Sequence, residues 1–211
     1  MRKWKALLAA MTFLALAGGV AHAGSIEGRF GITGQLGFTA AQKSSYTPAF
    51  AASHGLTDRE LKPDGGFIGG GSLMFGLTPI VALEAGALYQ PDTDYQNGGV
   101  EVLSISSTDV YVGFQLRNNV SDDLAAYLGA GVDVLFSDVE DVSGRNGDVD
   151  TVVGGHVHVG GDYFITPSIA LNLDLRALLF PDADVKSAGS TVANFSPITF
   201  VGLFGVRFFL N

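Results

Sequence analysis

The last stretch of the chain, Ser196–Asn211, alternates between two kinds of side chain. Every second residue from Ile198 to Leu210 is apolar or glycine, and the positions between them include Thr199 and Arg207. Such alternation predicts a β-strand with one apolar face. The stretch is longer than the mean strand of about five to six residues in soluble proteins. Its length is close to the roughly 9–11 residues that a tilted strand needs to cross a bilayer, so the chain is expected to cross a membrane with strands.

Seven further stretches alternate in the same way and are predicted to be strands. They are Arg29–Ala40, Gly66–Leu77, Val81–Gln90, Ser104–Leu116, Leu124–Phe136, Thr151–Ile165 and Ile169–Phe180. In each stretch one parity carries large apolar residues, such as Phe30, Val157 and Leu173, and the other parity carries polar or small ones. Together with the last stretch they make eight predicted strands, an even number.

The connections between these strands alternate in length. Three are short, at residues 78–80, 117–123 and 166–168, and the four others span residues 41–64, 91–103, 137–150 and 181–195. Tight turns at one end and longer loops at the other are typical of transmembrane barrels. The sequence therefore predicts an all-β fold, an eight-stranded antiparallel up-and-down transmembrane β-barrel.

Alternation alone does not say which face of the barrel wall is inside. A soluble barrel such as a lipocalin turns its apolar face inward and is the alternative. However, the polar face here is mostly Gly, Ser, Thr and Gln, and Lys43, Lys62 and Lys186 all fall in the long connections rather than in a predicted strand. A wall that faces water normally carries many Lys and Glu. The apolar face is therefore predicted to meet lipid, and the polar face to fill a narrow lumen.

The N-terminus has the three-part organisation of a secretory signal peptide. Basic residues within the first five positions precede the apolar run Ala6–Ala17, and small residues lead to Ala21-His22-Ala23. The run is shorter than the roughly 20 residues of a membrane-spanning helix. Residues 1–23 are therefore predicted to be a cleaved signal peptide, and residues 24–211 to form a single barrel domain.

Composition narrows the classes of function. Without the signal peptide, nine basic residues stand against 21 acidic ones, which gives a net charge of −12. A chain this acidic is not expected to bind nucleic acid. It has no cysteine, which excludes disulfides, thiol chemistry and cysteine-ligated metals.

Ionisable residues on the polar face are placed in the lumen by their parity. They are Arg29, Glu84, Asp109, Asp133, His156, His158, Asp162, Asp174, Arg176 and Arg207. An eight-stranded barrel is only wide enough for side chains to fill it, and an unpaired buried charge is costly. We therefore expect an internal network of ion pairs in which Arg176 and Arg207 share carboxylates such as Asp174 or Glu84. A proton or ion path through this network is the alternative.

Two histidines in this set invite a comparison with metal sites. His156, His158 and Asp162 lie on one face of a predicted strand, but no fourth ligand is evident, so luminal hydrogen bonding is the favoured interpretation. No metal, cofactor or catalytic site is predicted. The connection 137–150 holds five acidic residues against Arg145. It is expected to be a solvated acidic surface, with bridging by divalent cations to lipopolysaccharide phosphates as the alternative.

Several segments resemble the small eight-stranded barrels of the OmpA/OmpX superfamily. They are Leu77–Gly86, Tyr127–Gly131 and Gly161–Ser168, together with the C-terminal strand. The resemblance implies an outer-membrane location in a Gram-negative-type bacterium, a monomer, and outer-membrane lipid and lipopolysaccharide as partners. Gly205, Phe208 and Leu210 are similar to the closing-strand assembly signal of such barrels, which implies recognition by the barrel-assembly machinery.

Three functions are compatible with this architecture. The first is a non-enzymatic outer-membrane protein with a structural or surface-interaction role and acidic extracellular loops. The second is a narrow channel for small or hydrophobic solutes, as the similar OmpW barrels are thought to provide. The third is a lipid-modifying enzyme, but neither His156 nor His158 is predicted to face lipid and the sequence has no His-x-Ser motif, so no enzyme is expected.

Overall fold

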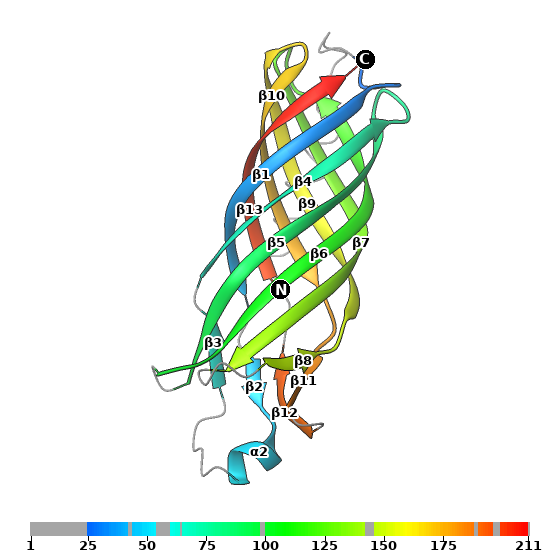
Figure 1. Ribbon diagram of the computed structural model, residues 1–211. Coiled ribbons are helices and arrows are strands. Elements are labelled where there is room, and N and C mark those ends of the chain that lie inside the picture. The colour runs from blue at the N-terminus through cyan, green and yellow to red at the C-terminus, as the bar shows by residue number, and fades with distance from the viewer. Residues whose placement is uncertain are drawn as a thin grey trace, which may run out of the picture.

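The computed structural model describes residues 25–41, 44–53, 60–63, 65–97, 100–141, 146–187, 190–195 and 199–210. These residues form a tall barrel of steeply tilted strands with smaller elements at one end (Figure 1). The barrel strands are β1 (Phe30–Ala41), β4 (Gly66–Gly76), β5 (Val81–Asn97), β6 (Val100–Asn119), β7 (Leu124–Asp141), β9 (Val152–Thr166), β10 (Ile169–Leu179) and β13 (Thr199–Leu210). Neighbours are antiparallel throughout, and β1 pairs with both β4 and β13, which closes the wall. The predicted eight-stranded antiparallel barrel is confirmed.

Several predictions fall at least partly outside the described residues. They are the signal peptide, residues 1–23, the beginning and end of the last predicted strand, Ser196–Ile198 and Asn211, and parts of the four long connections, at residues 42–43, 54–59, 64, 98–99, 142–145 and 188–189. Within the described part of the chain, no helix has the length and apolar character needed to cross a membrane.

Tight turns join the strands at one end of the barrel, called the turn end here. In the first turn, the amides of Leu77 and Thr78 donate to the Val81 carbonyl at 2.8 and 3.1 Å, and the Thr78 hydroxyl accepts from the Val81 amide at 3.0 Å. In the second, the Val120 amide donates to the Leu124 carbonyl at 2.7 Å. Side-chain caps of this kind satisfy backbone groups that have no ladder partner.

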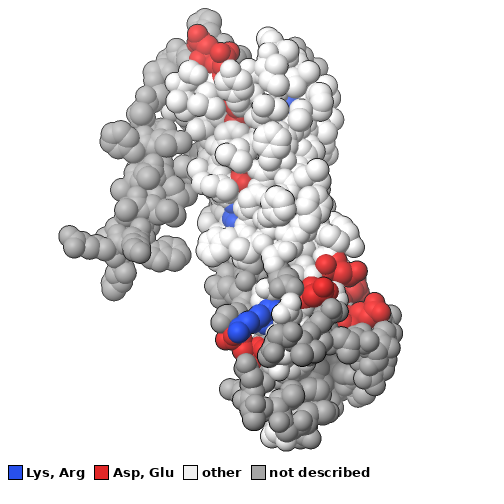
Figure 2. Space-filling view, turned by 90° about the vertical axis from the view of Figure 1, so that its left-hand side faces the viewer, with Lys and Arg blue, Asp and Glu red and all other residues white. Residues whose placement is uncertain are grey.

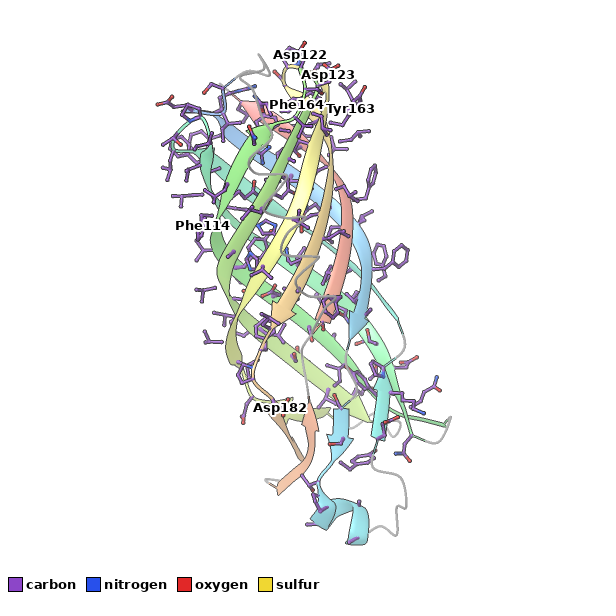
Figure 3. All side chains as sticks on the ribbon, turned by 180° about the vertical axis from the view of Figure 1, so that it is seen from behind. Phe114, Asp122, Asp123, Tyr163, Phe164 and Asp182 are labelled. Atoms are coloured by element: carbon purple, nitrogen blue, oxygen red, sulfur yellow. The ribbon has the colours of Figure 1, made fainter. Side chains whose placement is uncertain are left out.

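The outer wall of the barrel is apolar. Val157, Leu173 and Phe204 are 45%, 55% and 58% exposed. None of the outward side chains described in β1 from Phe30 to Phe38 is charged, and the same holds at this height in the other barrel strands. Figure 2 shows an almost entirely white belt with acidic side chains gathered toward its two ends. Figure 3 shows Phe114 pointing away from the barrel. Aromatic residues lie near both margins, with Phe30, Tyr163 and Phe208 toward the turn end and Phe38, Phe67, Tyr89, Phe136 and Phe200 toward the other. This distribution matches a lipid-facing wall between aromatic girdles.

A group of short elements, called the crown here, extends the barrel at the end opposite the turns (Figure 1). It consists of β2 (Ser44–Tyr46), α2 (Pro48–Ser53), β3 (Glu60–Pro63), β8 (Asn146–Val149), β11 (Ala183–Ser187) and β12 (Ser190–Phe195). The crown strands pair in the order β3-β2-β12-β11-β8, with β3 on β5 and β8 on β7. β5, β6 and β7 continue into the crown. A second ring of paired strands therefore closes next to the first, at the end opposite the turns. Closure leaves fewer exposed strand edges at this end.

The crown corrects the prediction that residues 41–64, 91–103, 137–150 and 181–195 are loops, and Lys62 and Lys186 lie in β3 and β11. The prediction ended the third strand at Gln90, directly before Pro91, a residue type that favours turns. Instead, a register shift between Gln90 and Thr93 absorbs this segment, and pairing with β6 resumes. Thr93 and Tyr95 then point inward and are buried. The inward side chains are therefore even-numbered before the bulge and odd-numbered after it, and the strand continues.

Candidate functional site

Side chains fill the lumen in three layers. A small apolar layer at the turn end contains Ile26, Met74, Ala82, Ala170 and Phe209. A larger apolar layer toward the crown contains Ile68, Leu88, Tyr95, Ile105, Leu135, Val139, Val152, Leu178, Phe180, Val201 and Leu203, and is joined by Tyr111. Between them lies a layer of buried polar side chains, called the polar plug here: Ser72, Glu84, Gln115, Arg117, Tyr127, Asp133, His156, His158, Asp162, Asn172, Asp174, Arg176 and Arg207.

Asp162 is bound by side chains from three other strands. Its Oδ2 accepts from Arg207 Nη1 at 2.6 Å and pairs with Arg117 Nη2, and its Oδ1 accepts from Asn172 Nδ2 at 2.8 Å. All four residues are at most 4% exposed. Because two guanidinium groups and an amide face one carboxylate, the buried negative charge is compensated in place.

Glu84 lies between two arginines. The Ser72 hydroxyl donates to Oε1 at 2.9 Å and Gln115 Nε2 donates to Oε2 at 3.0 Å. Arg207 Nη2 and Arg176 Nη2 each lie 3.8 Å from a carboxylate oxygen of Glu84. Both arginines therefore reach the same carboxylate, which is 2% exposed.

Asp174 gathers a third set of partners. Nδ1 of His158 lies 2.6 Å from its Oδ2, the Tyr127 hydroxyl donates to Oδ2 at 2.9 Å, and Arg176 Nε donates to Oδ1 at 3.3 Å. Tyr127 in turn accepts from Asn172 Nδ2 at 2.9 Å. Through Asn172, this set joins the hydrogen bonds of Asp162.

His156 and Asp133 form the part of the plug nearest the larger apolar layer. Nδ1 of His156 lies 2.8 Å from Asp133 Oδ1, and the ring of His156 is 5.2 Å from the rings of both His158 and Tyr111. The guanidinium of Arg176 lies 4.3 Å from the centre of the Tyr111 ring, within the range of a cation–π contact.

Glycines make room for the aromatic rings of the plug. Tyr127 pairs across the ladder with Gly160, His158 with Gly129, and the ring in each case occupies the space that a glycine Cβ would take. Tyr111 and Gly86 repeat the arrangement on β6 and β5, where an added Cβ would lie 2.6 Å from the Tyr111 hydroxyl oxygen. The absence of a side chain therefore lets the rings lie flat against the inner wall.

The described histidines are paired with carboxylates. Within the described residues, no group of three His, Asp or Glu side chains is placed to hold a metal ion. Nδ1 of each described histidine faces a carboxylate, and Nε2 of His158 lies 3.9 Å from Glu84 rather than beside a serine hydroxyl. The plug holds fixed charges in mutual contact across the whole width of the lumen.

A family model for the outer membrane protein β-barrel domain matches residues 6–196 of the chain. The chain belongs to this family. Comparison with curated proteins finds no match. The family and the similar outer membrane protein OprG together place this chain in the outer membrane of a Gram-negative-type bacterium, as the resemblance implied.

Several solved structures are similar to this outer-membrane barrel, among them the outer membrane proteins OprG and AlkL. OprG from Pseudomonas aeruginosa has a TM-score of 0.70 at 14% identity, over 90% of this chain and 99% of that one. AlkL, determined in DMPC bilayers, has a TM-score of 0.59 at 14% identity, over 92% and 95%. Neisserial surface protein A has a TM-score of 0.56 at 15% identity, over 86% and 99%. At these identities the similarity shows the fold alone.

The structure places nine of the ten residues assigned to the lumen inside the wall, each at most 3% exposed. Arg29 differs, because it is half-buried at the turn end, where its Nη2 donates to the Pro167 carbonyl at 2.9 Å and its guanidinium lies 5.0 Å from the centre of the Phe209 ring. Asp109 also stands apart, because neither of its carboxylate oxygens has a hydrogen-bond partner in the described structure.

Sequence reasoning missed Arg117, one of the two arginines on Asp162. The prediction placed it in the short connection at residues 117–123. In the structure β6 continues to Asn119, and Arg117 points inward in the same parity as Asp109 and Gln115. The alternation, continued by one residue, was the signal that could have found it.

Proposed function

We propose that this outer-membrane barrel is non-enzymatic and non-conducting, with a structural or surface-interaction role. The observation that supports the proposal is the filled lumen. Arg207, Asp162, Asp174 and Arg176 are each at most 2% exposed and bonded to one another or to shared partners from strands around the wall. Opening a path for solutes would require breaking buried ion pairs, which is costly.

The crown is the proposed contact surface. Asp92, Asp94, Asp138, Glu140 and Asp182 are exposed in its neighbourhood, whereas Lys62 is bound to Glu60 at 3.4 Å. Figure 3 shows Asp182 at this end, opposite Asp122 and Asp123 at the turn end. A surface of this charge favours partners that carry cations, including lipopolysaccharide whose phosphates are bridged by divalent ions.

We propose that the barrel-assembly machinery recognises the closing strand β13. Phe208 and Leu210 are 48% and 51% exposed on the outer wall, and Gly205 is buried where a Cβ would lie 2.8 Å from Gln35 Cγ. The pair therefore points away from the lumen, on the face of the strand that is free of luminal contacts. A Phe208→Ala variant should assemble more slowly in vivo than a Phe204→Ala variant, which changes the same wall outside the signal; equal assembly would contradict this role.

Conductance in planar bilayers tests the main proposal. The purified, folded protein should give no current above that of the bare bilayer at either polarity. A steady single-channel current would contradict the proposal.

A narrow passage for small apolar solutes is the second candidate, because the layer nearest the crown is apolar. The polar plug lies between this layer and the turn end, so passage through the whole lumen would need the plug to open. The test is the flux of a small apolar solute into vesicles. A faster flux into vesicles that contain the parent protein than into protein-free vesicles would favour this candidate over the first.

A further inference from the structure

A small cavity lies within the larger apolar layer, beside Asp109. Its volume is about 30 Å³. Since one water-sized group needs about 10–15 Å³ on this measure, the cavity has room for about two such groups. Leu88, Leu135 and Phe180 contribute to its walls, and Ser107 and Asp109 are among its polar lining residues. Asp109 is the one charged residue among the described residues that line it.

Asp109 forms no ion pair with a cationic side chain in the described structure, and its ionisable neighbours include a second carboxylate, Asp133. The residue is 2% exposed, and both carboxylate oxygens lack a hydrogen-bond partner in the described structure. Its direct neighbours across the two adjoining ladders are Leu88 and Leu135, which offer no donor. A buried carboxylate in such surroundings either carries a proton or is stabilised by a cation or by hydrogen-bond donors, and a ligand can supply the latter two.

The nearby arginine forms no ion pair with Asp109. Arg176 lies over the Tyr111 ring, its Nε donates to Asp174 at 3.3 Å and its Nη2 lies 3.8 Å from Glu84, whereas Nη1 and Nη2 have no hydrogen-bond partner in the described structure. Moving Arg176 to Asp109 would leave Asp174 and Glu84 with fewer ionic partners. The Asp109 carboxylate therefore lines the cavity without a salt bridge to this arginine.

We propose that this cavity binds the ammonium group of a small primary amine, with Asp109 as its counter-ion. An ammonium group has three donors, and two carboxylate oxygens with one hydroxyl can accept them. Ser107 supplies that hydroxyl, because its Oγ lies 2.8 Å from Ser137 Oγ and can donate there while accepting from the ligand. The leucine and phenylalanine side chains are suited to the carbon atom of the amine.

The chemistry of the site favours an amine over a metal cation. Hard divalent cations take six or more oxygen ligands, and an apolar lining with a few polar groups does not provide them. The lumen also carries excess negative charge if the histidines are neutral. Among the described residues, five buried acids face three buried arginines: Glu84, Asp109, Asp133, Asp162 and Asp174 against Arg117, Arg176 and Arg207. A bound ammonium reduces this excess.

Titration with methylammonium chloride tests the proposal on the purified, folded protein in detergent. Binding is followed by the NMR signals of ¹³C-labelled methylammonium and by the midpoint of thermal unfolding, at constant ionic strength. Saturable binding and a rising midpoint are expected. Methanol, which is neutral and of similar size, and potassium chloride should produce neither effect.

Asp109→Asn is the decisive variant, because it keeps the shape of the side chain and removes an unpaired charge, so the barrel should fold. Its affinity for methylammonium should fall by about tenfold or more, as expected for the loss of a charged hydrogen-bond partner. Asp138→Asn, which removes an exposed carboxylate of β7 near the crown, should bind like the parent.

Three results would overturn the proposal. They are no saturable binding by the folded parent, equal binding by Asp109→Asn and the parent, and equal effects of potassium and methylammonium. The first would also be the result if Asp109 simply carried a proton. None of these outcomes depends on whether the barrel conducts.

Discussion

Arg207 on β13 donates a hydrogen bond of 2.6 Å to Asp162 on β9, across the intervening strand β10. Neither residue exposes any surface. Arg117 on β6 approaches the same carboxylate from the other side, with β7 between them. One carboxylate thus connects arginines at both ends of a row of five adjacent strands. The wall of the barrel is closed by backbone ladders, and its cross-section is fixed by this contact through the lumen.

Replacing Arg207 by Ala should destabilise the barrel by about 3–5 kcal/mol, the usual cost of leaving one charge of a buried pair without its partner. Asp162 would keep Arg117, but Glu84 would lose one of its two arginines. The measurement is equilibrium unfolding in detergent, and the cavity left in the plug is also expected to give a small current in planar bilayers.

Two further variants separate this effect from a general loss of charge. Lys62→Ala breaks the exposed pair with Glu60 and should cost at most about 1 kcal/mol. Adding Glu84→Gln to Arg207→Ala should restore part of the stability, since the excess carboxylate is neutralised while the pair between Asp162 and Arg117 remains. If Arg207→Ala unfolds like the parent and carries no current, the pair does not hold the lumen closed.

Glycines opposite the rings of the plug should resist substitution. A Cβ at Gly160 would enter the space of the Tyr127 hydroxyl, and Tyr127 is held there by Asp174 and Asn172. Gly160→Ala should therefore cost about 1–3 kcal/mol through overpacking. Gly34→Ala is the matched control, because nothing lies within 4 Å of its added Cβ, and it should be neutral or slightly stabilising. Equal unfolding midpoints for the two variants would show that the ring of Tyr127 can move aside.

The alternation of side chains predicted the barrel and the inward or outward direction of its strands, because a period of two is a direct consequence of strand geometry. It could not predict which luminal residues meet. Asp162 and Arg117 are 45 residues apart, and their contact depends on strand tilt and on the register of every ladder between them.

The crown was not predictable for a different reason. Its short strands, such as β2 and β3, show little alternation, and their pairing depends on neighbours that are distant in sequence, for example Ala193 with Tyr46. Local composition favoured turns at Pro91, and the ladder between β5 and β6 overrode that preference. The position of Asp109 between Leu88 and Leu135 likewise depends on the register of two ladders, which the sequence alone does not reveal.

The outer wall should show a dependence on depth. Val157→Arg places a charge near the middle of the lipid-facing wall and should cost about 2–4 kcal/mol, whereas Ile165→Arg, beside the turn end, should cost about 0–1 kcal/mol. Both side chains are exposed in the structure, at 45% and 58%, so differences in core packing do not explain such a gap. Unfolding in lipid vesicles measures it. Equal costs for the two variants would mean that Val157 does not lie within the hydrocarbon region.

The closed wall should also make migration on gels depend on heating. Eight strands paired without an edge leave no backbone groups for detergent to solvate, so the unheated protein should stay compact in detergent and migrate differently from the boiled protein. Arg207→Ala should convert to the unfolded form at a lower temperature than the parent, because the plug contributes to the same cooperative structure. Gly34→Ala should convert at the temperature of the parent. The measurement is a series of samples heated stepwise before electrophoresis. Identical migration of boiled and unboiled parent would contradict the closed barrel itself, and an unchanged conversion temperature for Arg207→Ala would show that the wall is stable without the contact between Arg207 and Asp162.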